Sequence, residues 1–219
     1  FTIDKATGSN TYFMFSTAKS GRKDAPVVLW LNGGPGASSL LGFYDELGPF
    51  GIDENLEIVL RSVAWSNSVH LLALDNPLGV GYSHTQSLER MATNQTTVGA
   101  DLCAAMAQFC KLFPPLRANP FYATGESYAG IYIPRLAKSV LEGGDAALKA
   151  RLKGFAVGDA CAGNEVNCGG ESPWFNLLFL YGHGQLSTKM FDKVTSTCGQ
   201  KYLKQGGTAP KGCRAMLER

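Results

Sequence analysis

The chain alternates short apolar runs with polar turns over its first 160 residues. One of these runs, Val27–Leu31, is apolar at every position, which is typical of a strand buried on both faces of a sheet. Most of the runs stop directly before asparagine, aspartate or glycine, the residues that favour turns. The strands predicted in this way are Tyr12–Ser16, Val27–Leu31, Val69–Leu74, Phe121–Thr124 and Leu152–Val157.

Two segments between these runs have the pattern of helices. Thr96–Leu112 places apolar side chains on one face, and Pro114-Pro115 ends it. Ile131–Leu141 is the second predicted helix, although Pro134 should kink it or delay its regular part. Because strands alternate with helices, the sequence predicts an α/β fold built from βαβ units around a mostly parallel sheet.

The pattern changes near Cys161, where glycines, cysteines and short aromatic segments replace the alternation. We therefore expect a boundary there, with residues 1–160 in an α/β domain and residues 161–219 in a second, cysteine-containing region. Hydrophobic residues make up 45% of the 219 residues and the net charge is +2, which excludes a disordered chain and gives no excess of charge for a nucleic acid. The sequence contains no apolar run near the roughly 20 residues that a membrane span needs.

The six cysteines divide into two groups. Cys103 and Cys110 lie seven residues apart in a predicted helix, a rise of about 10.5 Å, which is too far for a mutual disulfide. We expect them to be buried, free thiols. The other four, Cys161, Cys168, Cys198 and Cys213, lie in loop-like sequence that suits disulfides of a secreted or lumenal protein, and their spacing does not suit zinc. A glycosylation sequon at Asn94 fits the same compartment.

The segment Gly125–Gly130 contains the pattern G-x-S-x-G with Ser127 at its centre. It follows a predicted strand and precedes a predicted helix, which is the context of a nucleophile elbow. The turn would expose Ser127 at the carboxyl edge of the sheet and direct the N–H of Tyr128 into an oxyanion hole. The loop Asn32–Gly36 ends an earlier strand, and its consecutive glycines could supply the second N–H donor.

Two segments then make a family resemblance specific. WLNGGPGASS at Trp30–Ser39 and GESYAGIYIP at Gly125–Pro134 resemble the signature blocks of the serine carboxypeptidases, which are α/β-hydrolases. The resemblance runs over residues 1–185 or so. It implies a mostly parallel sheet with helices on both faces, incomplete in this chain, and it implies that residues 161–219 begin the helical insertion of the family. Family chains are considerably longer.

The resemblance also implies roles for seven residues. They are Ser127 as the nucleophile, Gly34 and Tyr128 as oxyanion-hole donors, and Asn32, Gly33, Glu126 and Glu46 as the group that binds the C-terminal carboxylate of a peptide. A carboxylic acid can donate a hydrogen bond to a carboxylate only when it is protonated, and two close glutamates can share one proton. Without the family, a solvated or capping role would be preferred for Glu46. No cofactor or metal is implied.

The family's catalytic acid and base lie after the insertion, so the resemblance implies that this chain lacks both. The order Ser127, Asp159, His183 does match that of a hydrolase triad. His183, however, lies between two glycines and is better interpreted as a neighbour of a helix C-cap. His70 is expected to be a packing residue and His84 to be solvated. We expect the full-length protein to be the enzyme and residues 1–219 alone to be inactive.

The expected activity is the release of C-terminal residues from peptides or proteins, with an acyl-enzyme on Ser127. One alternative is acyl transfer to an alcohol, as in related plant enzymes, although Glu126 and Ala129 favour the peptidase. Another is a truncated, non-catalytic binding or protective protein. The resemblance and the cysteines together imply a lysosomal, vacuolar or secreted protein, and a homodimer of the full-length form is an open expectation.

Overall fold

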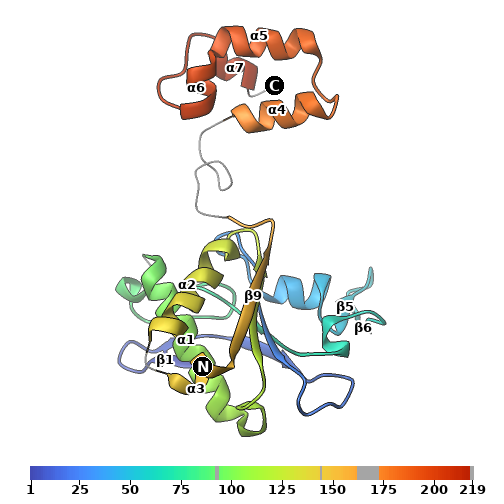
Figure 1. Ribbon diagram of the computed structural model, residues 1–219, viewed down its shortest axis with the longest axis vertical. Coiled ribbons are helices and arrows are strands. Elements are labelled where there is room, and N and C mark those ends of the chain that lie inside the picture. The colour runs from blue at the N-terminus through green and yellow to red at the C-terminus, as the bar shows by residue number, and fades with distance from the viewer. Residues whose placement is uncertain (92–93, 144, 162–172, 218–219) are drawn as a thin grey trace. The chain divides into compact units, whose positions relative to one another are not determined.

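The computed structural model describes residues 1–91, 94–143, 145–161 and 173–217 (Figure 1). The chain divides into two compact units, Phe1–Cys161 and Ala162–Arg219. The boundary expected from the sequence lies between residues 160 and 161.

The N-terminal unit is built on a five-stranded sheet in the order β3-β7-β4-β8-β9. These strands are β3 Phe13–Ser16, β7 His70–Leu74, β4 Val27–Leu31, β8 Phe121–Glu126 and β9 Leu152–Gly158. Only β3 runs antiparallel to its neighbour, and the pairs β7–β4, β4–β8 and β8–β9 are parallel. The predicted α/β fold with a mostly parallel sheet is therefore confirmed.

The strand that leads into the G-x-S-x-G segment is longer than the sequence predicted. β8 continues past Thr124 because Gly125 and Glu126 pair with Val157 and Gly158 of β9. Neither Gly125 nor Glu126 is a typical strand residue, so only the pairing with β9 reveals that the strand continues. β8 thus runs directly up to Ser127.

Three helices of this unit, α1 Gln95–Leu112, α2 Ala129–Glu142 and α3 Ala146–Arg151, contribute to one core with the sheet. The Asn94 side chain caps α1 by accepting a hydrogen bond of 2.9 Å from Thr97 N. The expectation that Pro134 would delay α2 is wrong, because the helix begins at Ala129 and runs through the proline. Pro134 lies in the second turn of the helix, where its missing N–H removes one hydrogen bond, and α2 is held by its buried face.

The sheet carries a core on each face. Val27, Leu29 and Leu31 of β4 pack with buried side chains of α1 and α2, which include Leu102, Met106, Phe109, Tyr132, Ile133 and Leu136. Trp30 lies on the other face of β4, where it packs with Phe43 and Leu47 beside the one-turn helix η1 Gly42–Glu46. The central strand is therefore buried on both sides, as its unbroken apolar run indicates.

Smaller elements surround this sheet. β1 Thr2–Asp4 pairs with β2 Ser9–Asn10, and β5 Phe50–Ile52 pairs with β6 Ile58–Leu60, both antiparallel. Three single turns of 3₁₀-helix complete the described part of the unit: η2 Trp65–Asn67, η3 Leu88–Arg90 and η4 Pro114–Leu116.

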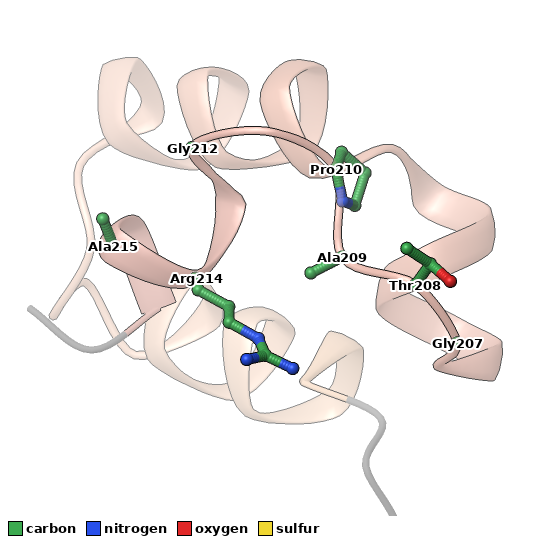
Figure 2. Close-up of a pocket in the computed structure, with 7 residues that line it drawn as sticks. All are labelled: Gly207, Thr208, Ala209, Pro210, Gly212, Arg214 and Ala215. Carbon is green, nitrogen blue, oxygen red and sulfur yellow. The ribbon is translucent and has the colours of Figure 1, made fainter.

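The described part of the C-terminal unit is helical. It contains α4 Trp174–Gly182, α5 Thr188–Cys198, α6 Gln200–Gln205 and α7 Cys213–Leu217. Its small core is centred on Leu177, Val194 and Leu203. A pocket of about 640 Å³ lies beside α7. Figure 2 shows its lining residues, of which Arg214 is the one charged side chain.

Two cysteine predictions can be compared with this structure. Cys103 and Cys110 are free, as expected, but both are half-buried because the face of α1 that carries them lies at the edge of the core. Cys198 and Cys213 form a disulfide, and Cys161 is also disulfide-bonded. Cys168 lies outside the described residues. Of the helices that the structure describes, none has the length and apolar character to cross a bilayer.

The disulfide between Cys198 and Cys213 should contribute much of the stability of the C-terminal unit. It joins α5 to α7 across 15 residues, and a loop of this size restricts the unfolded chain by about 3 kcal/mol. We expect Cys198→Ser/Cys213→Ser to lower the free energy of unfolding of this unit by about that amount. Urea unfolding followed by circular dichroism measures it, and an unchanged midpoint would contradict the prediction.

Candidate active site

Ser127 lies in a sharp turn between the end of β8 and the start of α2. Its φ is +52°, which is a left-handed backbone conformation that residues other than glycine rarely adopt. The turn is held on both sides, because Ser127 N donates to Gly158 O at 2.8 Å and Cys161 N donates to Ser127 O at 2.9 Å. A strained backbone at the end of a strand, fixed by its neighbours, is the geometry of a nucleophile elbow.

The two glycines of the G-x-S-x-G segment are required by close packing. A Cβ at Gly125 would lie 2.4 Å from Leu31 O, and one at Gly130 would lie 2.7 Å from Cys161 N. Both distances are shorter than any real side chain tolerates, so the turn can form only with glycine at these positions.

The loop Asn32–Gly36 lies against this turn. β4 and β8 are parallel and in register, with Leu31 opposite Gly125, so the segments that follow them meet at one edge of the sheet. A Cβ at Gly33 would lie 2.4 Å from Tyr128 N and 3.0 Å from Ser127 Cβ. Gly34 has a φ of +108°, which only glycine adopts readily. The structure therefore brings together the two segments from which the oxyanion donors were predicted.

The Asn32 side chain bridges two glutamates beside this turn. Its Nδ2 donates to Glu126 Oε1 at 2.9 Å and to Glu46 Oε1 at 3.1 Å. Its Oδ1 accepts from Trp30 Nε1 at 2.8 Å and from Gly42 N at 3.0 Å. Asn32 is only 1% exposed, so these four hydrogen bonds fix the orientation of its amide. The contact that Asn32 makes with each glutamate agrees with the predicted grouping.

The carboxyl of Glu46 has a raised pKa. Partial burial of this carboxyl is the main cause, and the negative charges of Glu126 and Asp45 raise the pKa further, while the hydrogen bond from Asn32 acts in the opposite direction. A carboxyl of this kind keeps its proton to a higher pH than a free glutamic acid does. It can then act as a hydrogen-bond donor toward an anion in mildly acidic solution.

Asp75 supports the same loop, and sequence reasoning missed this role. Its carboxylate is 1% exposed and accepts from Ser39 N at 3.0 Å, from Ser38 Oγ at 2.6 Å and from Tyr82 N at 3.0 Å. These bonds tie the loop after β4 to the loop after β7. The available signal was the position of Asp75 directly after a buried strand, where an acidic residue often meets the neighbouring loops.

The three histidines of the chain lie in different places. His70 begins β7 opposite Val27, at the other end of the sheet from Ser127, and it is buried as a packing residue. His84 is exposed, as expected, and contacts Asn10. His183, expected beside a helix C-cap, is itself the C-cap residue of α4 and belongs to the other unit, whereas Asp159 directly follows β9. Within the described ranges there is also no group of three or more side chains that could hold a metal ion.

Comparison with known proteins agrees with this geometry. The family model described as "Serine carboxypeptidase" matches residues 1–218. "Probable serine carboxypeptidase CPVL" of Mus musculus is 42% identical over 208 residues, which are 93% of this chain and 42% of that protein. "Venom serine carboxypeptidase" of Apis mellifera is 39% identical over 208 residues, 94% of this chain and 42% of that protein. The chain thus spans less than half the length of these curated relatives.

A solved structure shows the same fold. The crystal structure of KEX1(delta)p, a prohormone-processing carboxypeptidase from Saccharomyces cerevisiae, superposes with a TM-score of 0.71 at 20% sequence identity. The superposition covers 100% of this chain and 50% of the yeast chain. The elbow at Ser127, the glycine loop beside it and the match of the family model over nearly all residues lead to one conclusion. This chain belongs to the serine carboxypeptidase family.

Proposed function

We propose that this protein is a serine carboxypeptidase that removes residues from the C-termini of peptides. The supporting observation is the Asn32 amide, which contacts Glu46 and Glu126 beside Ser127. A protease that acts anywhere along a chain has no need of such a group. An exopeptidase must bind a free carboxylate, and a protonated glutamic acid paired with an amide donor can do so without repelling it.

In the proposed mechanism Ser127 Oγ attacks the carbonyl of the last peptide bond. A general base takes the proton of Ser127, the leaving amino acid receives a proton, and water then hydrolyses the acyl-enzyme. The N–H groups of Gly34 and Tyr128 stabilise the oxyanion. Asn32, the N–H of Gly33, Glu126 and Glu46 hold the terminal carboxylate.

The general base and its carboxylate partner are proposed to come from a part of the full-length protein outside residues 1–219. His70 begins its strand at the far end of the sheet, and the side chain of His84 contacts Asn10. The curated relatives are also more than twice as long as the region that they share with this chain.

We further propose that the protein works in the secretory pathway, in an acidic compartment such as a lysosome or vacuole or after secretion. The disulfide of Cys198 and the sequon at Asn94, whose side chain is exposed, fit such a location. The raised pKa of Glu46 fits an acidic compartment, because the protonated form is retained there.

The carboxylate-binding role predicts a specific pH dependence. Affinity for peptides with a free C-terminus should be highest below the raised pKa of Glu46 and fall as the pH rises through it, by up to about tenfold per pH unit, because one proton is lost. Glu46→Gln should flatten this decline, since an amide donates a hydrogen bond at any pH, and Glu126→Gln should act in the same direction more weakly, because the two glutamates share one proton. KM and kcat measured from pH 4 to 8 on the full-length protein test this.

Two comparisons make the experiment specific. C-terminally amidated peptides should bind poorly and respond little to either substitution, because they lack the carboxylate. Glu54→Gln, the same change at an exposed position of the β5–β6 connection, should leave the pH profile as in the wild type. If the substitutions change KM for free and amidated peptides alike, these glutamates do not bind the carboxylate.

A further inference from the structure

A polar pocket of the N-terminal unit lies at the opposite end of β8 from Ser127. It has a volume of about 310 Å³ and is bounded by the last turns of α1, by η4 and by α3. Asn119, which lies just before the start of β8, contacts its lining residue Arg151. Ser127 comes six residues after Phe121, a distance of about 20 Å along the strand, so this pocket is not part of the candidate active site.

The pocket carries an excess of positive charge. Lys111, Arg117 and Arg151 line it together with one carboxylate, Asp145, which leaves a net charge of +2. Asp145 is engaged elsewhere, because its Oδ1 accepts from Leu148 N at 2.9 Å and caps α3. In the part of the chain that the structure describes, none of the three cations forms an ion pair.

Arg151 is the unusual member of this group because it is only 6% exposed. Its Nε donates to Asn119 O at 2.9 Å, and its Nη1 contacts Cys110 Sγ. Its Nη2 is buried and has no hydrogen-bond partner. A buried guanidinium group without a carboxylate is strongly unfavourable, so the protein has a reason to recruit an anion here.

We propose that this pocket binds a tetrahedral oxyanion with two negative charges, either sulfate or a phosphate group. Two charges would balance the net +2 of the lining, whereas a single carboxylate would leave one cation uncompensated. The fork of a guanidinium group matches the spacing of phosphate and sulfate oxygens, and Nη2 of Arg151 is the donor that lacks an acceptor. Lys111 and Arg117 are exposed and complete the site from the solvent side.

The pocket can hold more than a bare ion. Its volume corresponds to about ten water molecules at roughly 30 Å³ each, so a sugar or peptide that carries the phosphate or sulfate also fits. The free ion and the larger ligand share the tetrahedral dianion, and binding measurements can show which of the two the pocket prefers.

Isothermal titration of the protein with sodium sulfate, against sodium chloride at equal ionic strength, tests the proposal. Sulfate stays doubly charged over the whole useful pH range. We expect saturable binding of one sulfate, weakened about tenfold or more in Lys111→Ala/Arg117→Ala. The matched control is Lys5→Ala/Lys19→Ala, which removes two exposed cations elsewhere and should bind as the wild type does. Inorganic phosphate and glucose 6-phosphate then distinguish a free ion from a group on a larger ligand, according to which binds more tightly.

Thermal unfolding gives an independent measurement. A hundredfold excess of sulfate over its Kd should raise the Tm of the wild type and of the Lys5→Ala/Lys19→Ala control by on the order of 5 °C more than that of Lys111→Ala/Arg117→Ala. The comparison between variants removes the general stabilisation that sulfate gives any protein. Arg151→Met should lose the sulfate-dependent rise in Tm if it folds. If it does not fold, Lys111→Ala/Arg117→Ala alone tests the proposal. Absence of saturable binding, or an equal response in all variants, would overturn the proposal.

Discussion

Replacement of Ser127 by alanine should lower kcat of the full-length protein by about 10⁴-fold or more and leave its stability close to that of the wild type. A serine nucleophile cannot be replaced by the binding groups around it, so only the residual effect of the oxyanion donors would remain. The backbone at position 127 has a φ of +52°, and alanine meets the same restriction there as serine. The Ser127 hydroxyl makes no hydrogen bond within the described residues, so its loss leaves no buried partner unsatisfied.

The measurement is turnover of blocked dipeptides, with urea unfolding as the check on stability. Ser62→Ala is the matched control, because Ser62 is exposed and lies outside the elbow. It should keep the activity of the wild type. Turnover that survives in Ser127→Ala would remove Ser127 from the mechanism.

Gly33→Ala should damage both activity and folding, although it adds a single methyl group. The new Cβ would lie 2.4 Å from Tyr128 N and 2.8 Å from Glu126 O, so the loop and the elbow must move apart. Overpacking of this kind costs about 1–3 kcal/mol. A displacement of about 1 Å at reacting groups lowers catalysis by about a hundredfold. Because these backbone atoms bracket Ser127, we expect kcat to fall far more than KM rises.

Gly154→Ala in β9 is the matched control for this experiment. A Cβ there would lie 3.6 Å from Tyr122 Cδ1, which is an ordinary contact. Its kcat and unfolding midpoint should stay close to those of the wild type. If Gly33→Ala behaves in the same way, the loop and the elbow are not packed together as described.

Local patterns predicted most of the sheet correctly. Val27–Leu31 was assigned without error because a strand buried on both faces needs an apolar residue at every position, and few other structures do. The elbow at Ser127 was also located correctly, because two glycines between a strand and a helix leave little choice of backbone. The helix around Pro134 was predicted, but the delay expected from the proline was wrong, since burial of α2 outweighs one lost hydrogen bond.

The polar network around Asn32 could not be derived from local patterns. Asn32 and Glu126 are 94 residues apart in sequence, and their contact exists only because β4 and β8 are neighbours in the sheet. Glu46, considered alone, would have been interpreted as a solvated carboxylate. It entered the predicted site through the family resemblance. Asp75 had only the signal of its position after a buried strand, because its partners lie on two loops whose proximity is decided by the strand order.

The hydrogen bonds that hold Ser127 have a consequence for the order in which the protein matures. Ser127 N pairs with Gly158 O, and Ser127 O accepts from Cys161 N, so the backbone of Ser127 is set by residues more than 30 positions later in the chain. β9 can supply these partners only after α2 and α3 have folded back and placed it beside β8 in a parallel pair. During synthesis the serine therefore emerges in an unconstrained turn. The backbone of Ser127 reaches its final position only when the chain as far as Cys161 has docked, so the geometry of the elbow depends on strand pairing that forms later than the elbow's own residues are made.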